Sequence, residues 1–580
     1  MAATPLMQQY YEIKKQNPGC ILFFRMGDFF ELFEEDAVVA SKILGLTLTS
    51  RNNGAAGETP LCGFPHHAAD RYVPKMVAAG YRIAICEQVE DPKLARGIVK
   101  RDVVEIISAG TAMDETNLNA KEANYLCAYM PAESAGESVF AFADVTTGYL
   151  AVSRSSVQAF ECEFCRRMPK EVVVAEGCEI PAGVMDIVRS ENILITEIPA
   201  FLFGAEHGRD VLFSHFKVES LVGLGLDGRD RETAVTGALL QYLMDQKKSE
   251  LSHFTGLEIL NLDDYMTLDP STLRNLELVR PLNADDYSST LCSVLDFTVT
   301  AMGGRVLKDW VSHPLISVEK IRERQSAVTE LVGNPMALDE LKESLTSILD
   351  MERLMGRVGS GRANARDLSG MGRSLCQASK VARVLSELHS PLFEQFRQVL
   401  ELAKGRGEEL LQNFNDDLPL TVREGGMIRE GANVELDAMN ADIQENLIAI
   451  RVVKSFVRQS YERRKFKKAV TDSDRENCVR YDRAAKPGVA NLMDIYSKLT
   501  GKSIPEIEAE FAGQGYGVFK PAVGEAVVEA LRPIREEATR LMADKAYLDS
   551  VYRAGAEKAA CVANRTLRKV YKKVGFYQGL

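Results

Sequence analysis

The chain of 580 residues changes its pattern near residue 250, and this change constrains the fold more than any other feature. Before that point, short apolar runs alternate with turns rich in glycine and proline, which is typical of mixed α/β domains. Beyond it, amphipathic helical stretches dominate, for example at residues 306–311, 318–331 and 337–354. Since a domain has roughly 100–200 residues, a single compact module is excluded. The sequence predicts a multidomain protein of class α/β plus α.

The first 110 residues predict a small α/β domain. Thr4 and Pro5 fit the cap and the first turn of a helix, and residues 21–25 form a strand-like apolar run. A second helix is expected around residues 31–42. Further short apolar runs follow at 76–79, 83–86 and 103–107.

A second α/β pattern extends from about residue 125 to residue 245. Residues 138–153 alternate between apolar and polar side chains around a Thr-Gly turn, which predicts a β-hairpin. Two more strands are predicted at 171–175 and 193–198.

Charge and cysteine content exclude several classes of protein. The chain has 70 basic and 82 acidic residues, a net charge of −12, so any contact with nucleic acid must be local. Its 11 cysteines lack the spacing of a secreted disulfide framework. No apolar stretch approaches the ~18 residues of a membrane span. We therefore expect a reduced, soluble, cytoplasmic protein with no membrane contact.

Two glycine motifs imitate nucleotide-binding loops. Residues 223–228 fit G-x-G-x-x-G, but no buried strand precedes them and no ribose-binding acid follows, which indicates a turn. Gly501, Lys502 and Ser503 imitate the end of a phosphate-binding loop. Tyr496 occupies the position of the first glycine of that loop, so the phosphate cradle cannot form as the motif requires.

Two further motifs imitate metal sites. Cys162 and Cys165 form a single C-x-x-C pair with no second pair and no nearby histidine, whereas zinc needs four ligands. We interpret them as two half-buried thiols on a helix. Asp144 ends a predicted strand, as in ribonuclease H-type hydrolases, but no set of partner carboxylates follows to hold two metals. We predict no catalytic residue and no metal site.

The strongest local signal is the run FFRMGDFFELF at residues 23–33, which combines a strand end, a glycine turn and a helix start. One interpretation is an exposed phenylalanine that wedges between bases, beside a glutamate that hydrogen-bonds a base edge. In the other, Phe23, Phe24, Phe30 and Phe33 are core residues and Glu31 is an acidic residue in the first turn of a helix. The run alone leaves both open.

Four ordered segments resemble the MutS family of DNA mismatch repair proteins. They are TPLMQQY at 4–10, FFRMGDFFELFEEDA at 23–37, GETPLCGFPHH at 57–67 and ICEQVEDP at 85–92. The resemblance continues through ADVTTG at 143–148 and LDPSTLRNLE at 268–277 to about residue 437. It implies a small α/β mismatch-recognition domain at 1–110, an RNase H-like α/β connector at 111–248 and an incomplete, long all-helical core (lever) at 249–437.

The family's Phe-x-Glu motif falls on Phe29 and Glu31. The resemblance implies that Phe29 stacks on a mispaired base from the minor groove while Glu31 hydrogen-bonds that base. A mismatched base step costs less free energy to unstack and kink than a paired one. Such a wedge therefore recognises the deformability of the DNA and not its base sequence. Met26 and Arg51 are further candidate DNA contacts. The implied partners are double-stranded DNA with a mismatch, a second copy of the chain and a MutL-like protein.

The resemblance to MutS ends near residue 437, where the family continues with a DNA clamp and a P-loop ATPase that uses ATP and magnesium. No Walker A sequence occurs in the 580 residues, so we expect no ATPase activity and no cofactor in this chain. Residues 438–466 instead resemble an intracellular helix of ABC-type exporters. Residues 467–580 resemble the C-terminal helical domain of tryptophanyl-tRNA synthetase, without its active-site signatures.

The expected function is binding of mismatched DNA in mismatch repair, by a chain truncated before the clamp and the ATPase and impaired for that reason. Two alternatives stay open. One is a synthetase-related fragment that lacks an aminoacylation site, for which tRNA binding is not expected. The other is a non-functional mosaic reading frame, since the junctions at 436–440 and 465–469 suit both neighbouring families.

Overall fold

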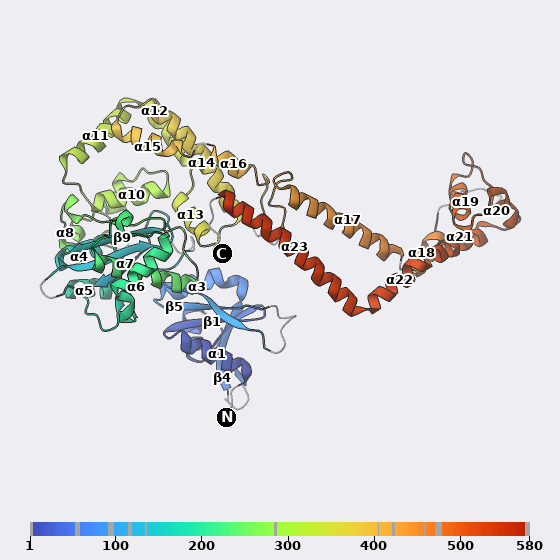
Figure 1. Ribbon diagram of the computed structural model, residues 1–580, viewed down its shortest axis with the longest axis horizontal. Coiled ribbons are helices and arrows are strands. Elements are labelled where there is room, and N and C mark those ends of the chain that lie inside the picture. The colour runs from blue at the N-terminus through green and yellow to red at the C-terminus, as the bar shows by residue number, and fades with distance from the viewer. Residues whose placement is uncertain are drawn as a thin grey trace. The chain divides into compact units, whose positions relative to one another are not determined.

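The computed structural model describes residues 4–52, 58–90, 98–113, 119–133, 136–283, 287–403, 405–419, 424–456, 459–469 and 478–574. Its contacts define two compact units, Met1–Arg429 and Glu430–Leu580. The first unit contains two mixed sheets followed by helices, and the second is helical (Figure 1). The predicted change from α/β to helical structure near residue 250 is confirmed.

The first sheet has the strand order β3-β4-β2-β1-β5-β6. Its strands are β1 (Cys20–Met26), β2 (Phe29–Phe33), β3 (Thr49–Asn52), β4 (Glu58–Pro65), β5 (Arg82–Gln88) and β6 (Arg101–Ile107). The pair β1–β5 is parallel and all other pairs are antiparallel. Helix α1 (Pro5–Gln16) packs on one face of this sheet, while α2 (Glu34–Leu44) and α3 (Ala69–Ala78) pack on the other. Two apolar cores therefore enclose the sheet.

The aromatic run differs from the sequence prediction at one point. The helix expected from residue 31 begins at Glu34, and Phe29–Phe33 is strand β2. Pairing with β1 on one side and β4 on the other satisfies its backbone hydrogen bonds. Along β2, Phe30 and Leu32 are buried while Phe29 is exposed, which is the alternation of a half-buried strand. The capped helix after Thr4 and the strand at 21–25 are confirmed.

The second sheet has the strand order β11-β10-β7-β8-β9-β12. Its strands are β7 (Tyr125–Met130), β8 (Ser138–Asp144), β9 (Tyr149–Ser155), β10 (Glu171–Ala175), β11 (Leu194–Ile198) and β12 (Glu258–Ile259). Helices α4 (Val157–Arg167) and α5 (Ala182–Ser190) cover one face, and α6 (Ala205–Phe216) and α7 (Asp230–Lys247) cover the other. The predicted hairpin and both predicted strands are confirmed.

Helices complete the first unit. They are α8 (Pro270–Asn275), α9 (Leu291–Leu295), α10 (Ala301–Ser312), α11 (Val318–Gly333), α12 (Pro335–Thr346), α13 (Met351–Gly359), α14 (Ala365–Leu385), α15 (Pro391–Glu401) and α16 (Arg406–Leu411). The predicted helical stretch 337–354 is two helices, because the Asp350 side chain accepts a hydrogen bond from the Arg353 backbone and starts α13 anew.

A buried ionic cluster joins the first sheet to the rest of this unit. The Glu105 carboxylate on β6 accepts a hydrogen bond from the Lys247 ammonium of α7, with an N···O distance of 2.7 Å, and a second from Arg362 beyond α13. Glu105 and Lys247 are both buried. One carboxylate therefore links three segments that are distant in the sequence.

The second unit contains α17 (Val434–Phe456), α18 (Gln459–Lys467), α19 (Pro487–Thr500), α20 (Ile504–Glu510), α21 (Tyr516–Ala530), α22 (Arg532–Ala543) and α23 (Lys545–Val574). Its core centres on Val489, Met493, Ile507, Phe519 and Val523. The domain boundary predicted at 437/438 falls inside α17. In the part of the chain that the structure describes, every helix is too short or too polar to cross a membrane.

Candidate nucleic-acid interface

A tight turn presents Phe29 at the end of the β1–β2 hairpin. Met26 and Phe29 are paired in register, so only Gly27 and Asp28 form the turn. Gly27 has φ = +58°, a conformation that glycine adopts at no steric cost and that hairpin turns of this length require. The backbone N–H of His66 donates to the Asp28 carbonyl at 2.9 Å and holds the turn against β4. The Phe29 side chain is 48% exposed.

Phe29 and Glu31 lie on the same face of the sheet, because alternate residues of a strand point the same way. The next residue on that face, Phe33, is buried under α1, where the rings of Tyr10 and Phe33 are 5.0 Å apart. Glu31 is half-buried. Helix α1 thus covers one end of this face and leaves the aromatic ring and the carboxylate accessible at the other.

Arg101 supplies positive charge near this pair. Its guanidinium lies 5.1 Å from the ring centre of Phe24, the β1 residue that pairs with Glu31, and donates to the Arg25 carbonyl at 2.6 Å. Burial lowers the pKa of Arg101, and the charges of Cys86 and Glu31 oppose that shift. No sequence motif marks Arg101, since its position depends on β1 and β5 lying between β2 and β6.

The structure brings only part of the predicted site together. Met26 is half-buried beside Phe29, as expected for two residues that flank one turn. The backbone of Arg51 lies on the edge strand β3 and pairs with Thr59 of β4, whereas Phe29 pairs with Pro65. Six residues of extended chain separate these positions by roughly 20 Å. Contact of Arg51 with DNA stays a prediction.

The two glycine motifs are turns and helix ends. In the 223–228 segment, Gly225 ends a short 3₁₀ helix with φ = +70°, and Gly228 also has a positive φ, +67°, which confirms the predicted turn. Gly501 ends α19 in a left-handed conformation, and Ser503 caps α20. The ammonium of Lys502 pairs with Glu510 at 2.8 Å. This arrangement does not fit the phosphates of a nucleotide.

The residues that imitate metal sites have structural surroundings. Asp144 is buried, and its carboxylate accepts from the Asn124 and Thr146 backbones and from the Thr146 hydroxyl, which fixes the β8–β9 turn. Cys162 and Cys165 lie on α4, as predicted, and burial raises the pKa of both thiols. Among the described residues, no three His, Cys, Asp or Glu side chains are placed to hold a metal ion.

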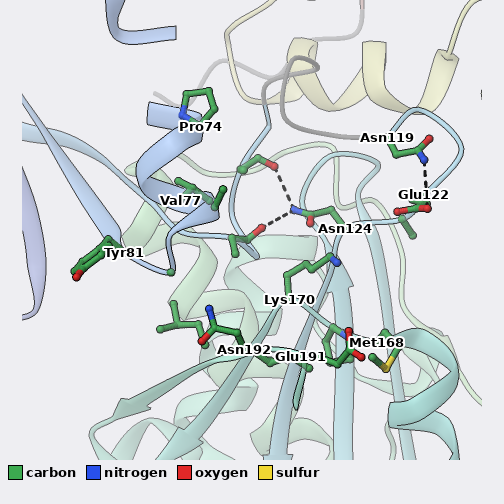
Figure 2. A pocket seen from close by; sticks show the side chains of 18 of the residues that line it. Pro74, Val77, Tyr81, Asn119, Glu122, Asn124, Met168, Lys170, Glu191 and Asn192 are labelled. Carbon is green, nitrogen blue, oxygen red and sulfur yellow. Dashed lines mark hydrogen bonds between the residues drawn. The ribbon is translucent and has the colours of Figure 1, made fainter. Parts of the chain in front are cut away.

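A cavity of about 740 Å³ lies within the first unit (Figure 2), and residues of the Phe29 turn are not part of its lining. Its wall includes two carboxylates, each of which pairs with a cation at 3.0 Å: Glu191 with Arg280, and Glu122 with Lys308. The Asn124 amide donates to backbone carbonyls at the centre of the view, which orders the segment that follows the first sheet. The lining includes residues of α3, which packs on the first sheet, and of the loops and strand β11 of the second sheet. We therefore interpret the cavity as a gap where the two sheet domains meet.

The sequence of domains in this structure matches one family. The model of MutS domain I matches residues 4–116, that of MutS domain II matches residues 124–255, and that of MutS domain III matches residues 271–558. Through these three domains the chain belongs to the MutS family. The domain III match crosses 438–466 and much of 467–580, for which the sequence suggested exporter and synthetase families.

The curated relatives that match the chain are DNA mismatch repair proteins named MutS. The chain is similar to the DNA mismatch repair protein MutS of Halothermothrix orenii, with 37% identity over 439 residues, 75% of this chain and 48% of that protein. It is 38% identical to the MutS protein of Salinibacter ruber over 445 residues, 76% of this chain and 49% of that protein. The chain thus spans about half the length of the curated relatives it matches.

Proposed function

We propose that this chain binds double-stranded DNA at mismatches, with Phe29 as the wedge and Glu31 as the carboxylate that contacts the displaced base. One observation carries the proposal. Of the phenylalanines in the run 23–33, four are at most 2% exposed and Phe29 is 48% exposed. A ring that the core leaves accessible, on a turn fixed by hydrogen bonds, is suited to stacking on a base.

Phe29 and Glu31 contribute in different ways to the discrimination between mismatched and matched DNA. Insertion of the Phe29 ring unstacks a base step, and this costs less at a mismatch than at a paired step. The Glu31 carboxylate accepts a hydrogen bond from a base that presents a donor, and it repels phosphates otherwise. The pair therefore favours selectivity over total affinity.

ATP and magnesium have no part in the proposed binding step. Gly501, Lys502 and Ser503 come nearest to a phosphate-binding loop, and their helix-capping and ion-pair contacts do not fit a nucleotide. Association with a second copy of the chain or with a MutL-like protein is an expectation from the family. The exporter-like and synthetase-like interpretations of 438–580, and an impaired truncated function, also stay predictions.

The test measures binding of the purified chain to a G·T-mismatched and a matched duplex by fluorescence anisotropy at two salt concentrations. We expect Phe29→Ala to remove the preference for the mismatch by weakening mismatch binding roughly 5- to 150-fold, because base–aromatic stacking contributes about 1–3 kcal/mol. Phe396→Ala is the matched control, since Phe396 on α15 is also 48% exposed.

Equal, strongly salt-dependent binding of both duplexes that Phe29→Ala does not change would refute the proposal. Such binding would reflect phosphate contact alone. It would leave the non-functional alternative as the better interpretation.

A further inference from the structure

Cys478 lies in a cluster of nucleophilic and charged side chains in the second unit. The Lys486 ammonium donates to the Cys478 sulfur at 3.2 Å and to the Cys478 carbonyl oxygen at 3.2 Å. It also lies 3.4 Å from the Tyr516 hydroxyl oxygen. Lys486 is only 4% exposed, whereas Cys478 is partly exposed. A buried cation thus contacts a thiol that solvent reaches.

We propose that Cys478 is a reactive thiol, activated by Lys486, and a site of covalent modification by peroxides and other small electrophiles. The ammonium lies within hydrogen-bond distance of the sulfur, at 3.2 Å, and a cation in that position stabilises the negative charge that sulfur carries when it attacks an electrophile. Asp482 also faces this cluster and interacts with the Lys486 charge. The proposal does not depend on DNA binding.

The surroundings of the other cysteines differ from those of Cys478. Burial raises the thiol pKa at nine positions, namely Cys20, Cys62, Cys86, Cys127, Cys162, Cys165, Cys178, Cys292 and Cys376. A raised pKa reduces the thiolate fraction, and the thiolate is the nucleophile. Cys561 on α23 is exposed and serves as the internal reference for an accessible cysteine.

Reaction with hydrogen peroxide illustrates the step. The Cys478 thiolate attacks one peroxide oxygen, so that an S–O bond forms, the O–O bond breaks and hydroxide leaves. The Lys486 ammonium gives a proton to the hydroxide, which becomes water. Sulfur is oxidised by two electrons to sulfenic acid, and the peroxide is reduced. A small thiol then condenses with the sulfenic acid to a mixed disulfide and a second water.

Modification also affects the local fold. Lys486 is the cap residue of α19 and is held between Cys478 before that helix and Tyr516 at the start of α21. An added group on sulfur displaces the ammonium from this position. We therefore expect modification at Cys478 to loosen the packing of α19 against α21.

The experiment follows alkylation of the full chain by iodoacetamide at pH 7, with the rate at each cysteine measured by peptide mass spectrometry. We expect Cys478 to react at least 10-fold faster than Cys561, although Cys561 is the more exposed. Lys486→Met removes the charge and should abolish this advantage, while Lys486→Arg should retain most of it. Peroxide followed by a sulfenic-acid trap should label Cys478 first.

Equal rates at Cys478 and Cys561 would overturn the proposal, as would a rate advantage that survives Lys486→Met. Loss of folding does not mimic the expected result. A variant that merely unfolds this region would expose Cys478 and raise its reactivity, whereas the proposal requires a decrease.

Discussion

The His313 imidazole should stabilise the contact between the second sheet and the helices in a pH-dependent way. His313 is buried, and its nitrogens lie 3.1 Å from Glu163 of α4 and 3.1 Å from Asp309 of α10. Burial alone would lower its pKa, but hydrogen bonds and charges from Asp309 and Glu163 raise it from 6.5 to about 9. Arg167 also faces this cluster, and the Tyr265 ring packs on His313.

The direction and size of the effect follow from that pKa. A group whose pKa is raised by folding contributes fully below its unfolded value of 6.5, and the contribution disappears as pH rises through about 9. A shift of this size corresponds to about 3 kcal/mol. We therefore expect His313→Gln to lower the free energy of unfolding by about 3 kcal/mol at pH 6 and by little at pH 9.5.

Urea unfolding followed by the fluorescence of Trp310 measures this difference, since Trp310 is the single tryptophan and lies on α10. Subtracting the variant from the wild type at each pH cancels the titration of groups that do not contact His313, and Glu163 and Asp309, whose pKa values His313 lowers, are ionised throughout pH 6 to 9.5. His389→Gln is the control, because the His389 side chain is 91% exposed. A wild-type advantage over His313→Gln that is constant from pH 6 to 9.5 would refute the reasoning.

Two other substitutions test packing and charge burial. Glu105→Gln removes the carboxylate that Lys247 and Arg362 share, and should lower the free energy of unfolding by about 3–5 kcal/mol in urea; no change would contradict the buried cluster. Gly237→Ala would press a methyl group against the Gly208 Cα where α6 crosses α7, and should lower the free energy of unfolding by about 1–3 kcal/mol in a thermal unfolding experiment. Gly223→Ala is the control, because a methyl group there meets nothing within 4 Å.

The sequence could predict most elements of the first unit because their signals are local. The cap at Thr4, the alternation in 138–153 and the glycine turn at Gly27 depend on neighbours within a few residues. The start of α2 could not be predicted in the same way. The acidic segment that begins at Glu34 predicts a helix, and the sequence does not show where that helix starts. Phe29–Phe33 is a strand because it pairs with β4, which lies about thirty residues later in the chain.

That difference changes the geometry of the candidate site. Had a helix begun at Glu31, Phe29 would have preceded it, and no strand alternation would have placed the two side chains on one face. In strand β2 the same spacing puts both side chains on one face. The family resemblance named the two residues, and strand β2 places both on one face, as the proposed contact with a single base requires. Arg101 was missed because its nearness to Glu31 depends on the sheet order.

A wedge can unstack a base step only if the element that carries it does not yield. Phe29 stands on β2, which is hydrogen-bonded to β1, and the bonding continues through β5 to β6. On β6, Glu105 is held by Lys247 and Arg362. The paired strands and the buried ionic contact of Glu105 therefore resist displacement of the Phe29 ring, because β2 is connected through them to the second sheet and the helices. Glu105→Gln, which weakens these contacts, should then reduce mismatch selectivity even though the residue is remote from the Phe29 turn. Because the support matters only when the wedge is present, Glu105→Gln should add little to Phe29→Ala in that assay.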